Sequence, residues 1–228
     1  MYSIRPTRCV LLCFSLLAIF GSPIGAQESE TAKSSELTEN TEDVEAKPIE
    51  LAPLLNGSME TANEAGVPKG WLFVSSPKEQ QSIASVSEGV FEGESAAAID
   101  CTQGDNQFTN LMQFLKADGY RGKRVRYRAA VRTDELDFTS RVQLWFRVDL
   151  ESGMGAFDNM QERPISTKKW KHFDVVLDVA KDAKRINVGM FVIGKGKVWI
   201  DDATLEVVDD KTPVTTSSNA HALSLIHI

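Results

Sequence analysis

The stretch RGKRVRYRAAVRTDELDFTSRVQLWFRVDL, residues 121–150, decides the fold, because it contains two alternating patterns in succession. In the first, apolar side chains occupy every second position from Val125 to Val131, and arginines occupy most positions between them. In the second, apolar side chains occupy every second position from Val142 to Leu150. Successive side chains of a β-strand point to opposite faces of a sheet, so each pattern predicts a strand with one buried face.

The positions between these apolar ones define a candidate binding face. We expect the two strands to share one outer face that is basic and carries one large aromatic residue. The candidate ligand-binding residues are Arg126, Arg128, Arg141, Gln143, Trp145 and Arg147, with Asp158 from the loop that follows. An indole can stack on a sugar ring, and Arg and Gln supply directional hydrogen bonds, so the set would suit a neutral or anionic saccharide. The alternative is a solvated or loop-covered face whose arginines pair with Asp149, Asp158 and Glu162.

The loop at residues 157–164 has two readings. It is denser in polar side chains than a connection needs, so it could fold over the basic face with Asp158 paired to Arg147. Alternatively, Asp158 or Asn159 bonds the local backbone, as turn residues do.

Further short strand patterns occupy the rest of the chain. They cover residues 69–74, 82–87, 95–101, 108–116, 172–177, 185–193 and 197–208. Gly, Asn, Asp or Pro lies between most of them, and no convincing amphipathic helix interrupts them. This arrangement is typical of an antiparallel β-sandwich, in which Trp71 and Trp199 either close the ends of the core or bridge the terminal strands.

The two ends of the chain predict segments outside this domain. Arg5 and Arg8, an apolar run and small residues up to Ala26 predict a secretory signal peptide at residues 1–26, whose removal takes away two positive charges and leaves −9. Residues 27–53 read as a disordered acidic linker, 54–209 as the β-sandwich and 210–228 as a disordered tail. Residues 223–228 match a translated sequencing adapter; if they are one, the natural chain continues past residue 222, and the alternative is an ordinary disordered terminus.

Composition and motifs exclude several functions. The net charge of −7 disfavours wholesale nucleic-acid binding. Only Cys101 remains after signal removal, and it reads as a small buried residue. The chain contains no G-x-S-x-G, H-E-x-x-H or phosphate-loop motif, so we expect no enzyme activity.

Several blocks resemble galactose-binding-like jelly rolls, a superfamily with many carbohydrate-binding modules. The opening Asn56-Gly57-Ser58-Met59-Glu60 and Pro68-Lys69-Gly70-Trp71, the element at residues 89–96 and the closing strand at residues 198–206 carry the resemblance. The blocks LMQ, YRGKRVR, LWFRVD, FDNMQERPI and VWIDD are similar to an uncharacterised bacterial module. That module occurs alone in secreted proteins, beside helix-turn-helix regulators and ahead of hydrolases.

The resemblance also implies a structural calcium ion. Related jelly rolls hold one between the opening Glu and an Asp of the closing strand, positions that match Glu60 and either Asp201 or Asp202. Calcium prefers several hard oxygen ligands. The alternative is that Asp201 and Asp202 only interrupt strand pairing at a bulge.

Three functions follow as hypotheses. The first is an exported, secreted or periplasmic, non-catalytic module that binds a saccharide or small polar ligand on its Arg/Trp face. The second is a structural or protein-interaction accessory of a larger envelope protein. The third is a fragment of a hydrolase. None involves nucleic acid or stable membrane insertion after signal cleavage.

Overall fold

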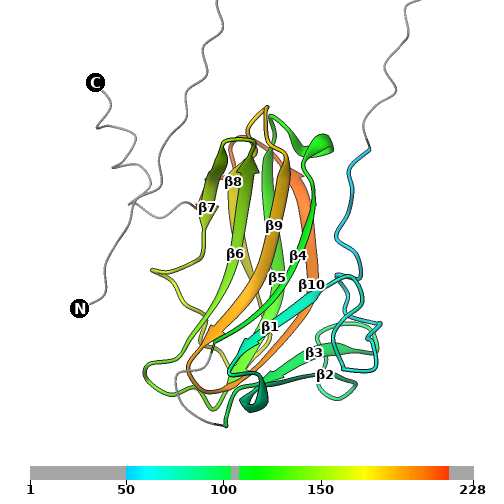
Figure 1. Ribbon diagram of the computed structural model, residues 1–228, viewed down its shortest axis with the longest axis vertical. Helices are drawn as coiled ribbons and strands as arrows, with labels where there is room; N and C mark the ends of the chain where they lie inside the picture. Colours follow the sequence, from blue (N-terminus) through cyan, green and yellow to red (C-terminus); the bar gives the residue numbers. More distant parts are fainter. Residues whose placement is uncertain (1–49, 104–107, 216–228) are drawn as a thin grey trace, which may run out of the picture. The chain divides into compact units, whose positions relative to one another are not determined.

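The computed structural model describes residues 50–103 and 108–215, which form an antiparallel jelly-roll β-sandwich (Figure 1). The predicted fold class is therefore confirmed. The strands are β1 (Leu72–Ser76), β2 (Ser82–Val86), β3 (Ala96–Asp100), β4 (Phe108–Lys116), β5 (Arg124–Asp134), β6 (Arg141–Leu150), β7 (Gly153–Asp158), β8 (Lys171–Asp178), β9 (Arg185–Ile193) and β10 (Lys197–Val208). Two short 3₁₀ turns, η1 (Lys78–Gln80) and η2 (Asp118–Tyr120), complete the elements of these residues.

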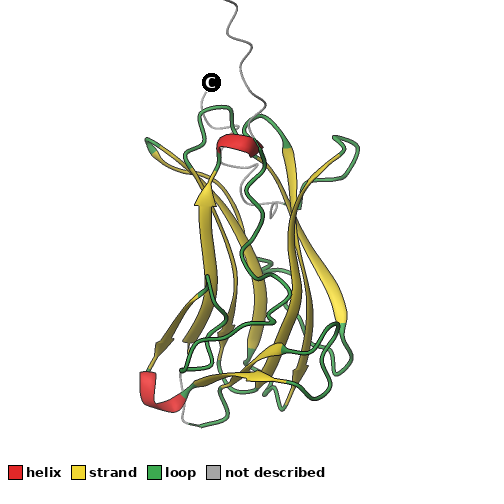
Figure 2. Cartoon of the chain, turned by 90° about the vertical axis from the view of Figure 1, so that its right-hand side faces the viewer, coloured by secondary structure: helices red, strands yellow, loops and turns green. Residues whose placement is uncertain are grey.

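The strands form two five-stranded layers, seen edge-on in Figure 2. Sheet I has the order β1-β4-β9-β6-β7, and sheet II has the order β2-β3-β10-β5-β8. The strands predicted from the alternation were found within a few residues. β7 was missed, because its sequence GMGAFD lacks a strong strand pattern and begins within a glycine-rich turn.

The predicted pairing of the two central strands is wrong. β5 pairs with β10 and β8 in sheet II, whereas β6 pairs with β9 and β7 in sheet I. Alternation specifies which side of a strand is buried, but not which strand lies beside it. The apolar faces of β5 and β6 therefore face each other across the core, and their polar faces lie on opposite sides of the sandwich.

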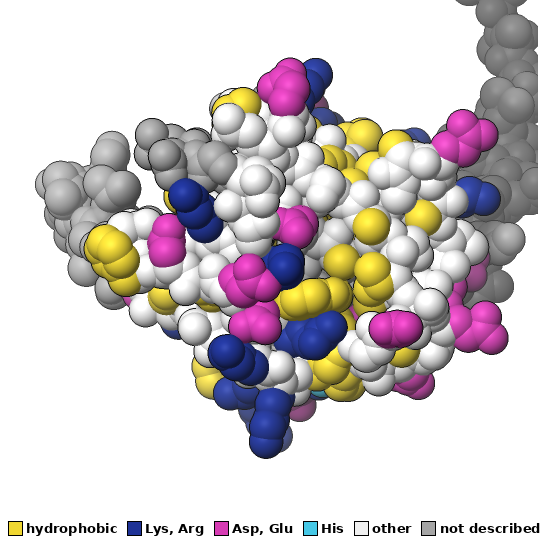
Figure 3. Space-filling model, turned by 90° about the horizontal axis from the view of Figure 1, so that it is seen from below, with side chains coloured by type: hydrophobic (Ala, Val, Ile, Leu, Met, Phe, Trp, Pro, Cys, Tyr) yellow, Lys and Arg dark blue, Asp and Glu magenta, His cyan; other side chains and the backbone are white. Residues whose placement is uncertain are grey.

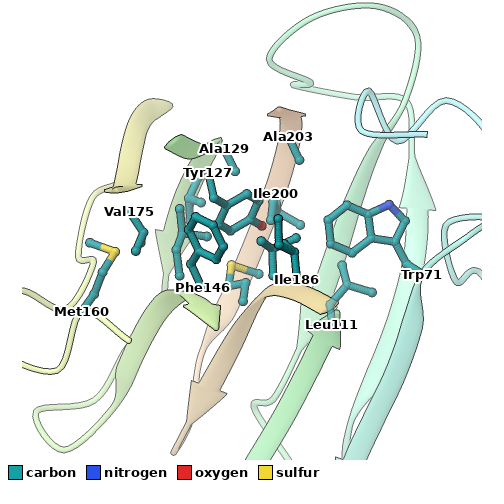
Figure 4. Packing of buried hydrophobic residues seen from close by; sticks show 14 of the residues in the cluster. Trp71, Leu111, Tyr127, Ala129, Phe146, Met160, Val175, Ile186, Ile200 and Ala203 are labelled. Carbon is teal, nitrogen blue, oxygen red and sulfur yellow. The ribbon is translucent and has the colours of Figure 1, made fainter. Parts of the chain in front are cut away.

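The core fills the space between the layers (Figure 4). Tyr127 from β5 and Phe146 from β6 are both fully buried within it, along with aliphatic side chains such as Ile186 and Ile200. Burial of this kind contributes about 25 cal/mol per Å² of apolar surface removed from water.

The segment before β1 runs along the open edge between the sheets (Figure 2). The Tyr120 hydroxyl donates to the Ala52 carbonyl over 2.9 Å, and Gln113 exchanges two hydrogen bonds with the backbone of Leu55. The indole nitrogen of Trp71 donates to the Leu55 carbonyl at 3.0 Å. Trp71 thus closes one end of the core, as predicted from the sequence.

The described ends of the chain reach slightly beyond the predicted domain of residues 54–209. Thr215 exchanges hydrogen bonds with Val176 of β8, so contacts with the sandwich continue past residue 209. The predicted signal peptide, most of the linker and the suspected adapter lie outside the described residues. Within the described residues, no helix has the length and apolar character needed to cross a membrane.

Candidate functional site

The outer face of sheet I is apolar and largely uncovered. Cross-strand register places rows of side chains on it, for example Val74, Asn110, Phe191 and Gln143, and next to them Leu72, Met112, Gly189 and Trp145. Six of its large apolar side chains are exposed, and they are Leu72, Val74, Phe108, Phe114, Met154 and Ile193. Contiguous apolar surface of this kind marks an interaction site more often than scattered single residues do.

Trp145 forms the floor of this face rather than a raised platform. Its indole lies across Gly189, since a Cβ added at that glycine would come within 2.8 Å of the indole nitrogen. That nitrogen donates to Asn110 Oδ1 at 2.9 Å, and the residue is only 6% exposed. Gln143 beside it is 2% exposed and donates to the Asn159 carbonyl. The exposed aromatic surface of the face comes instead from Phe114 and Phe108.

Charged side chains gather at one end of the same face. Asp149 bonds both Arg147 and Arg185, with closest distances of 2.8 and 2.9 Å, and accepts a third partner, the Asn187 amide, at 2.9 Å. Burial opposes the ionisation of Asp149, but the hydrogen bonds from Arg185, Arg147 and Asn187 outweigh this effect. They hold the pKa of Asp149 below its ordinary value.

The Asp158 loop follows the second reading from the sequence. Asp158 accepts the Met160 backbone N–H at 2.9 Å and pairs with Arg163 at 2.5 Å, so it does not pair with Arg147. Asn159 accepts the Gln161 backbone N–H in the same way. Asp158 is buried and serves the loop, whose contact with the face is the Asn159 carbonyl and, at the edge, the Gln161 carbonyl held by Arg141.

The outer face of sheet II carries the arginines of β5, and acidic neighbours pair with them. Arg128 makes a bidentate pair with Asp174 at 2.6 and 2.7 Å, and Arg126 contacts Glu206 at 3.0 Å. The neighbouring Arg124 pairs with Asp178. The predicted single face with six arginine, glutamine and tryptophan side chains therefore does not form, and Arg126 and Arg128 belong to an ion-pair ladder on the opposite side.

A loop covers the rest of that outer face. The guanidinium of Arg132 lies 3.9 Å from the centre of the Trp199 ring and 5.5 Å from that of Trp170. The loop between β2 and β3 packs over this cluster: Trp170 donates to the Gly89 carbonyl, and Phe91 contacts the Trp170 and His172 rings. Trp199 thus lies outside the core, so the prediction that it closes one end of the core is wrong.

One end of the sandwich mixes both signs of charge, as Figure 3 shows. Lys168 pairs with Asp134 at 3.1 Å and Lys197 with Glu135 at 2.7 Å. A hollow of about 390 Å³ lies beside these pairs, lined by residues that include Thr133 and Leu136. Because its charges are paired locally, this end gives no preference for an ionic ligand.

The predicted calcium ligands lie together in a hollow of about 310 Å³. Glu60 accepts the Glu94 N–H, and Asp201 accepts those of Phe91 and Glu92. Burial, together with the charge of Glu60, raises the pKa of Asp201, so a cation would relieve a real electrostatic cost.

The ligand set is nevertheless incomplete. No group of three His, Cys, Asp or Glu side chains within residues 50–103 and 108–215 is placed to hold a metal. Asp202 bonds His172 instead, beside a register shift between Asp201 and Thr204 that matches the predicted bulge. Oxygen donors fit calcium, but backbone or hydroxyl oxygens would have to complete the shell, so the ion stays a prediction.

Cys101 has the structural role expected of it. It is fully buried, and burial raises the pKa of its thiol to about 11. A thiol of this kind is protonated at neutral pH and is a poor nucleophile.

Sequence reasoning missed several residues of the open face. Asn110, Phe114, Arg185, Asn187 and Phe191 come from β4 and β9, which flank β6 or lie one strand beyond it. Their alternation was visible in the sequence, but their nearness to Trp145 depends on strand order. The smallest signal was Gly189, an isolated glycine within an apolar strand, which marks a place where another group approaches the backbone closely.

These features define the chain as a jelly-roll β-sandwich module with one open and one occupied sheet face. No protein-family model matches the chain. It is 35% identical over 151 residues to the uncharacterized HTH-type transcriptional regulator YbfP of Bacillus subtilis (strain 168), a match that covers 64% of the chain and 50% of that protein. The chain therefore spans about half the length of the curated relative it matches.

Solved structures with a similar fold include the enzymatically active domain of tailspike protein 4 of bacteriophage CBA120. That match has a TM-score of 0.52 and 13% identity, over 68% of this chain and 21% of that one. TmCBM61 in complex with β-1,4-galactotriose matches with a TM-score of 0.47 and 17% identity, over 69% and 100%. The CBM22-1 xylan-binding domain of Paenibacillus barcinonensis Xyn10C matches with a TM-score of 0.43 and 12% identity, over 69% and 96%.

Proposed function

We propose that this module is exported and binds a saccharide, without catalysis, on the outer face of sheet I. The observation that carries the proposal is the contrast between the two outer faces. On sheet II, arginines are paired with acids and a loop covers the aromatic cluster. On sheet I, aromatic and aliphatic side chains are exposed beside amide groups.

The chemistry of the open face suits a sugar. The C–H faces of a pyranose pack against aromatic rings, and Phe114 is 53% exposed while Phe108 and Phe191 lie with ring centres 6.1 Å apart. The side chain of Asn110, on the same face, supplies a directed polar group that orients a ligand on an otherwise apolar surface. Trp145 lies beside Asn110 and donates to it, so the role of Trp145 is to position Asn110.

The test compares two exposed phenylalanines. Phe114→Ala removes aromatic surface from the face, whereas Phe138→Ala removes a side chain that is 101% exposed in the β5–β6 loop. Binding to a panel of neutral and acidic polysaccharides is measured by affinity electrophoresis and calorimetry. We expect Phe114→Ala to weaken binding about tenfold, as loss of one stacking contact does, and Phe138→Ala to leave it unchanged.

A panel to which the wild-type protein does not bind would overturn the proposal. Equal losses in the two variants would also contradict it, because the face would then have no special role.

A second candidate is a protein-interaction role, favoured by one observation. β1 is an edge strand of sheet I, and its outward Leu72 and Val74 are both exposed. Edge strands with apolar side chains pair readily with other chains. Concentration-dependent dimerisation that a Val74→Lys variant abolishes, without any polysaccharide binding, would favour this role over the first.

A further inference from the structure

Two guanidinium groups share one carboxylate at the end of the open face. Arg147 on β6 donates a hydrogen bond from Nη2 to Asp149 Oδ2 at 3.1 Å, and its Nε lies 2.8 Å from Oδ1 as an ion-pair contact without hydrogen-bond geometry. Arg185 on β9 approaches Asp149 Oδ2 through Nε at 3.2 Å and Nη2 at 2.9 Å. The Asn187 amide donates to the same oxygen at 2.9 Å. Two positive charges are thus fixed by one negative charge.

Both guanidiniums stay accessible while their partner does not. The side chains of Arg147 and Arg185 are 38% and 51% exposed, and that of Asp149 is 14% exposed. Arg185 donates to Asp149 through Nε and Nη2 and Arg147 through Nη2, and no hydrogen bond from Nη1 of either arginine is found in the described part of the chain. A planar guanidinium held in this way has donors left for a further anion and loses little freedom on binding it.

An aromatic surface adjoins this pair. Phe114, Leu115, Lys116, Lys184 and Arg185 line a hollow of about 360 Å³, and the Arg185 guanidinium lies 5.8 Å from the centre of the Phe114 ring. Lys184 contacts Glu151, whose side chain is 84% exposed, and such an exposed pair is weak. Lys116 makes no ion pair among the residues that the structure describes. Positive charge therefore exceeds negative charge here, although the chain as a whole is acidic.

The ion-pair ladder of sheet II shows that an excess of positive charge is not a general property of this fold. There the arginines are matched by acids, Arg124 by Asp178 and Arg128 by Asp174. On sheet I, by contrast, Asp149 serves two arginines, and Lys116, in the same cross-strand row, has no acidic partner within residues 50–103 and 108–215. The imbalance is confined to the end of the face that is otherwise apolar and amide-bearing.

We propose that this end of the face is a subsite for an anionic substituent on a sugar ring that packs against Phe114. The shared chemistry is a carboxylate of a uronic acid or a sulfate ester, held by Arg147 and Arg185 with Lys116 beside them. This inference rests on the proposed saccharide binding and adds the class of sugar.

The register supports this geometry. Phe114, Asn187 and Arg147 are cross-strand neighbours in one row, and Lys116, Arg185 and Asp149 are neighbours in the next. Neighbouring strands lie about 4.8 Å apart. A sugar ring that packs against Phe114 on β4 therefore reaches toward β9, where its substituent meets the guanidinium of Arg185. A neutral sugar would leave these donors without a partner.

The experiment uses chemically matched polysaccharides with the full chain. Glucuronoxylan is compared with its carboxyl-reduced form, and κ-carrageenan with its desulfated form, so that the two arms separate carboxylate from sulfate. We expect the acidic member of at least one pair to bind about tenfold more tightly, an advantage that NaCl reduces. Arg185→Gln and Lys116→Gln should remove that advantage, so that the acidic and neutral members bind equally.

Arg128→Gln is the matched control, since it removes one positive charge from the opposite face. Arg185→Lys, which keeps the charge but not the planar donor pair, should recover only part of the preference. Equal binding of acidic and neutral members by the wild type overturns the inference but leaves saccharide binding standing. Loss of the preference in Arg128→Gln would assign it to overall charge and overturn the subsite, and absence of all binding would overturn both proposals.

Discussion

The sequence predicts the same kind of outer face for β5 and β6, but in the structure the two faces differ. Both strands alternate apolar residues with arginines, and both have an aromatic residue nearby. On sheet II the neighbours β8 and β10 supply Asp174, Asp178 and Glu206, which pair with Arg124, Arg126 and Arg128 of β5. On sheet I the neighbour β9 supplies Gly189 and Asn187 opposite Trp145 and Arg147. The neighbouring strands thus determine whether the charges on a polar strand face are neutralised.

The two tryptophans of these faces give the largest test of that difference. Trp145 is buried on Gly189, whereas Trp199 is half-buried under the Arg132 guanidinium. We expect Trp145→Ala to lower the free energy of unfolding by about 3–5 kcal/mol, the cost of removing a buried aromatic side chain. Trp199→Ala should cost about 1 kcal/mol, the scale of a partly exposed cation–π contact. Urea denaturation of both variants measures the two values.

The reverse order of these costs would mean that the loop-covered cluster of sheet II, rather than the floor of sheet I, stabilises the sandwich. Similar m-values in the two variants are required for the comparison, because a changed slope indicates a changed unfolded or native ensemble.

The alternation from Val125 to Leu150 was enough to predict the β-sandwich and its buried side chains. The alternation could not predict strand order. A strand that stays in the sheet of the preceding strand and a strand that crosses to the other sheet bury the same side chains. The error therefore fell on Arg126 and Arg128, which the sequence placed beside Trp145. Of the two readings of Asp158, the pairing with Arg147 is wrong and the local one is right, since Asp158 accepts the Met160 N–H and pairs with Arg163.

The Gly189→Ala variant tests whether the packing of Trp145 on sheet I depends on the close approach of its indole to the backbone at Gly189. A Cβ there would lie 2.5 Å from the Leu111 carbonyl oxygen, 2.8 Å from the Trp145 indole nitrogen and 2.9 Å from Met112 Cβ. We expect Gly189→Ala to destabilise the protein by about 1–3 kcal/mol through overpacking. In a Trp145→Ala background the added cost should be smaller, because one of the three clashes is gone.

Equal costs of Gly189→Ala in the two backgrounds would show that the clash with the backbone of Leu111 dominates. The indole would then not need the glycine, and the view of Trp145 as a side chain seated on the sheet would have to change. Thermal unfolding of the four proteins in one double-mutant cycle gives the coupling directly.

Calcium binding tests whether the carboxylates of Glu60 and Asp201, beside sheet II, need a metal ion to balance their charges. Glu60 and Asp201 repel each other in a partly buried hollow, so calcium should bind the folded state and raise Tm by about 2–4 °C for each kcal/mol of binding. Glu60→Gln should abolish the rise, and magnesium should produce less of it. No response of the wild type to either CaCl₂ or EDTA would show that the backbone N–H groups alone satisfy these oxygens.

The smallest expected effect concerns the ladder of sheet II. Burial opposes ionisation of Asp174, but its hydrogen bonds to Arg128 prevail and lower the pKa of Asp174. A lowered pKa in the folded state contributes stability above the ordinary pKa of the carboxyl and loses it as the pH falls through the folded value. Arg128→Gln should therefore cost about 0.5–1 kcal/mol at neutral pH, the value of a half-exposed pair.

That cost should shrink as the pH falls below the ordinary carboxyl pKa of about 4 and through the lower folded value, because Asp174 then becomes protonated in both proteins. Arg147→Gln is the control on sheet I, since Asp149 keeps Arg185 and Asn187 and its charge stays compensated. A pH-independent cost for Arg128→Gln would assign the effect to lost packing of the arginine stem. In that case the ladder would differ from the open face by packing and coverage alone, and not by charge.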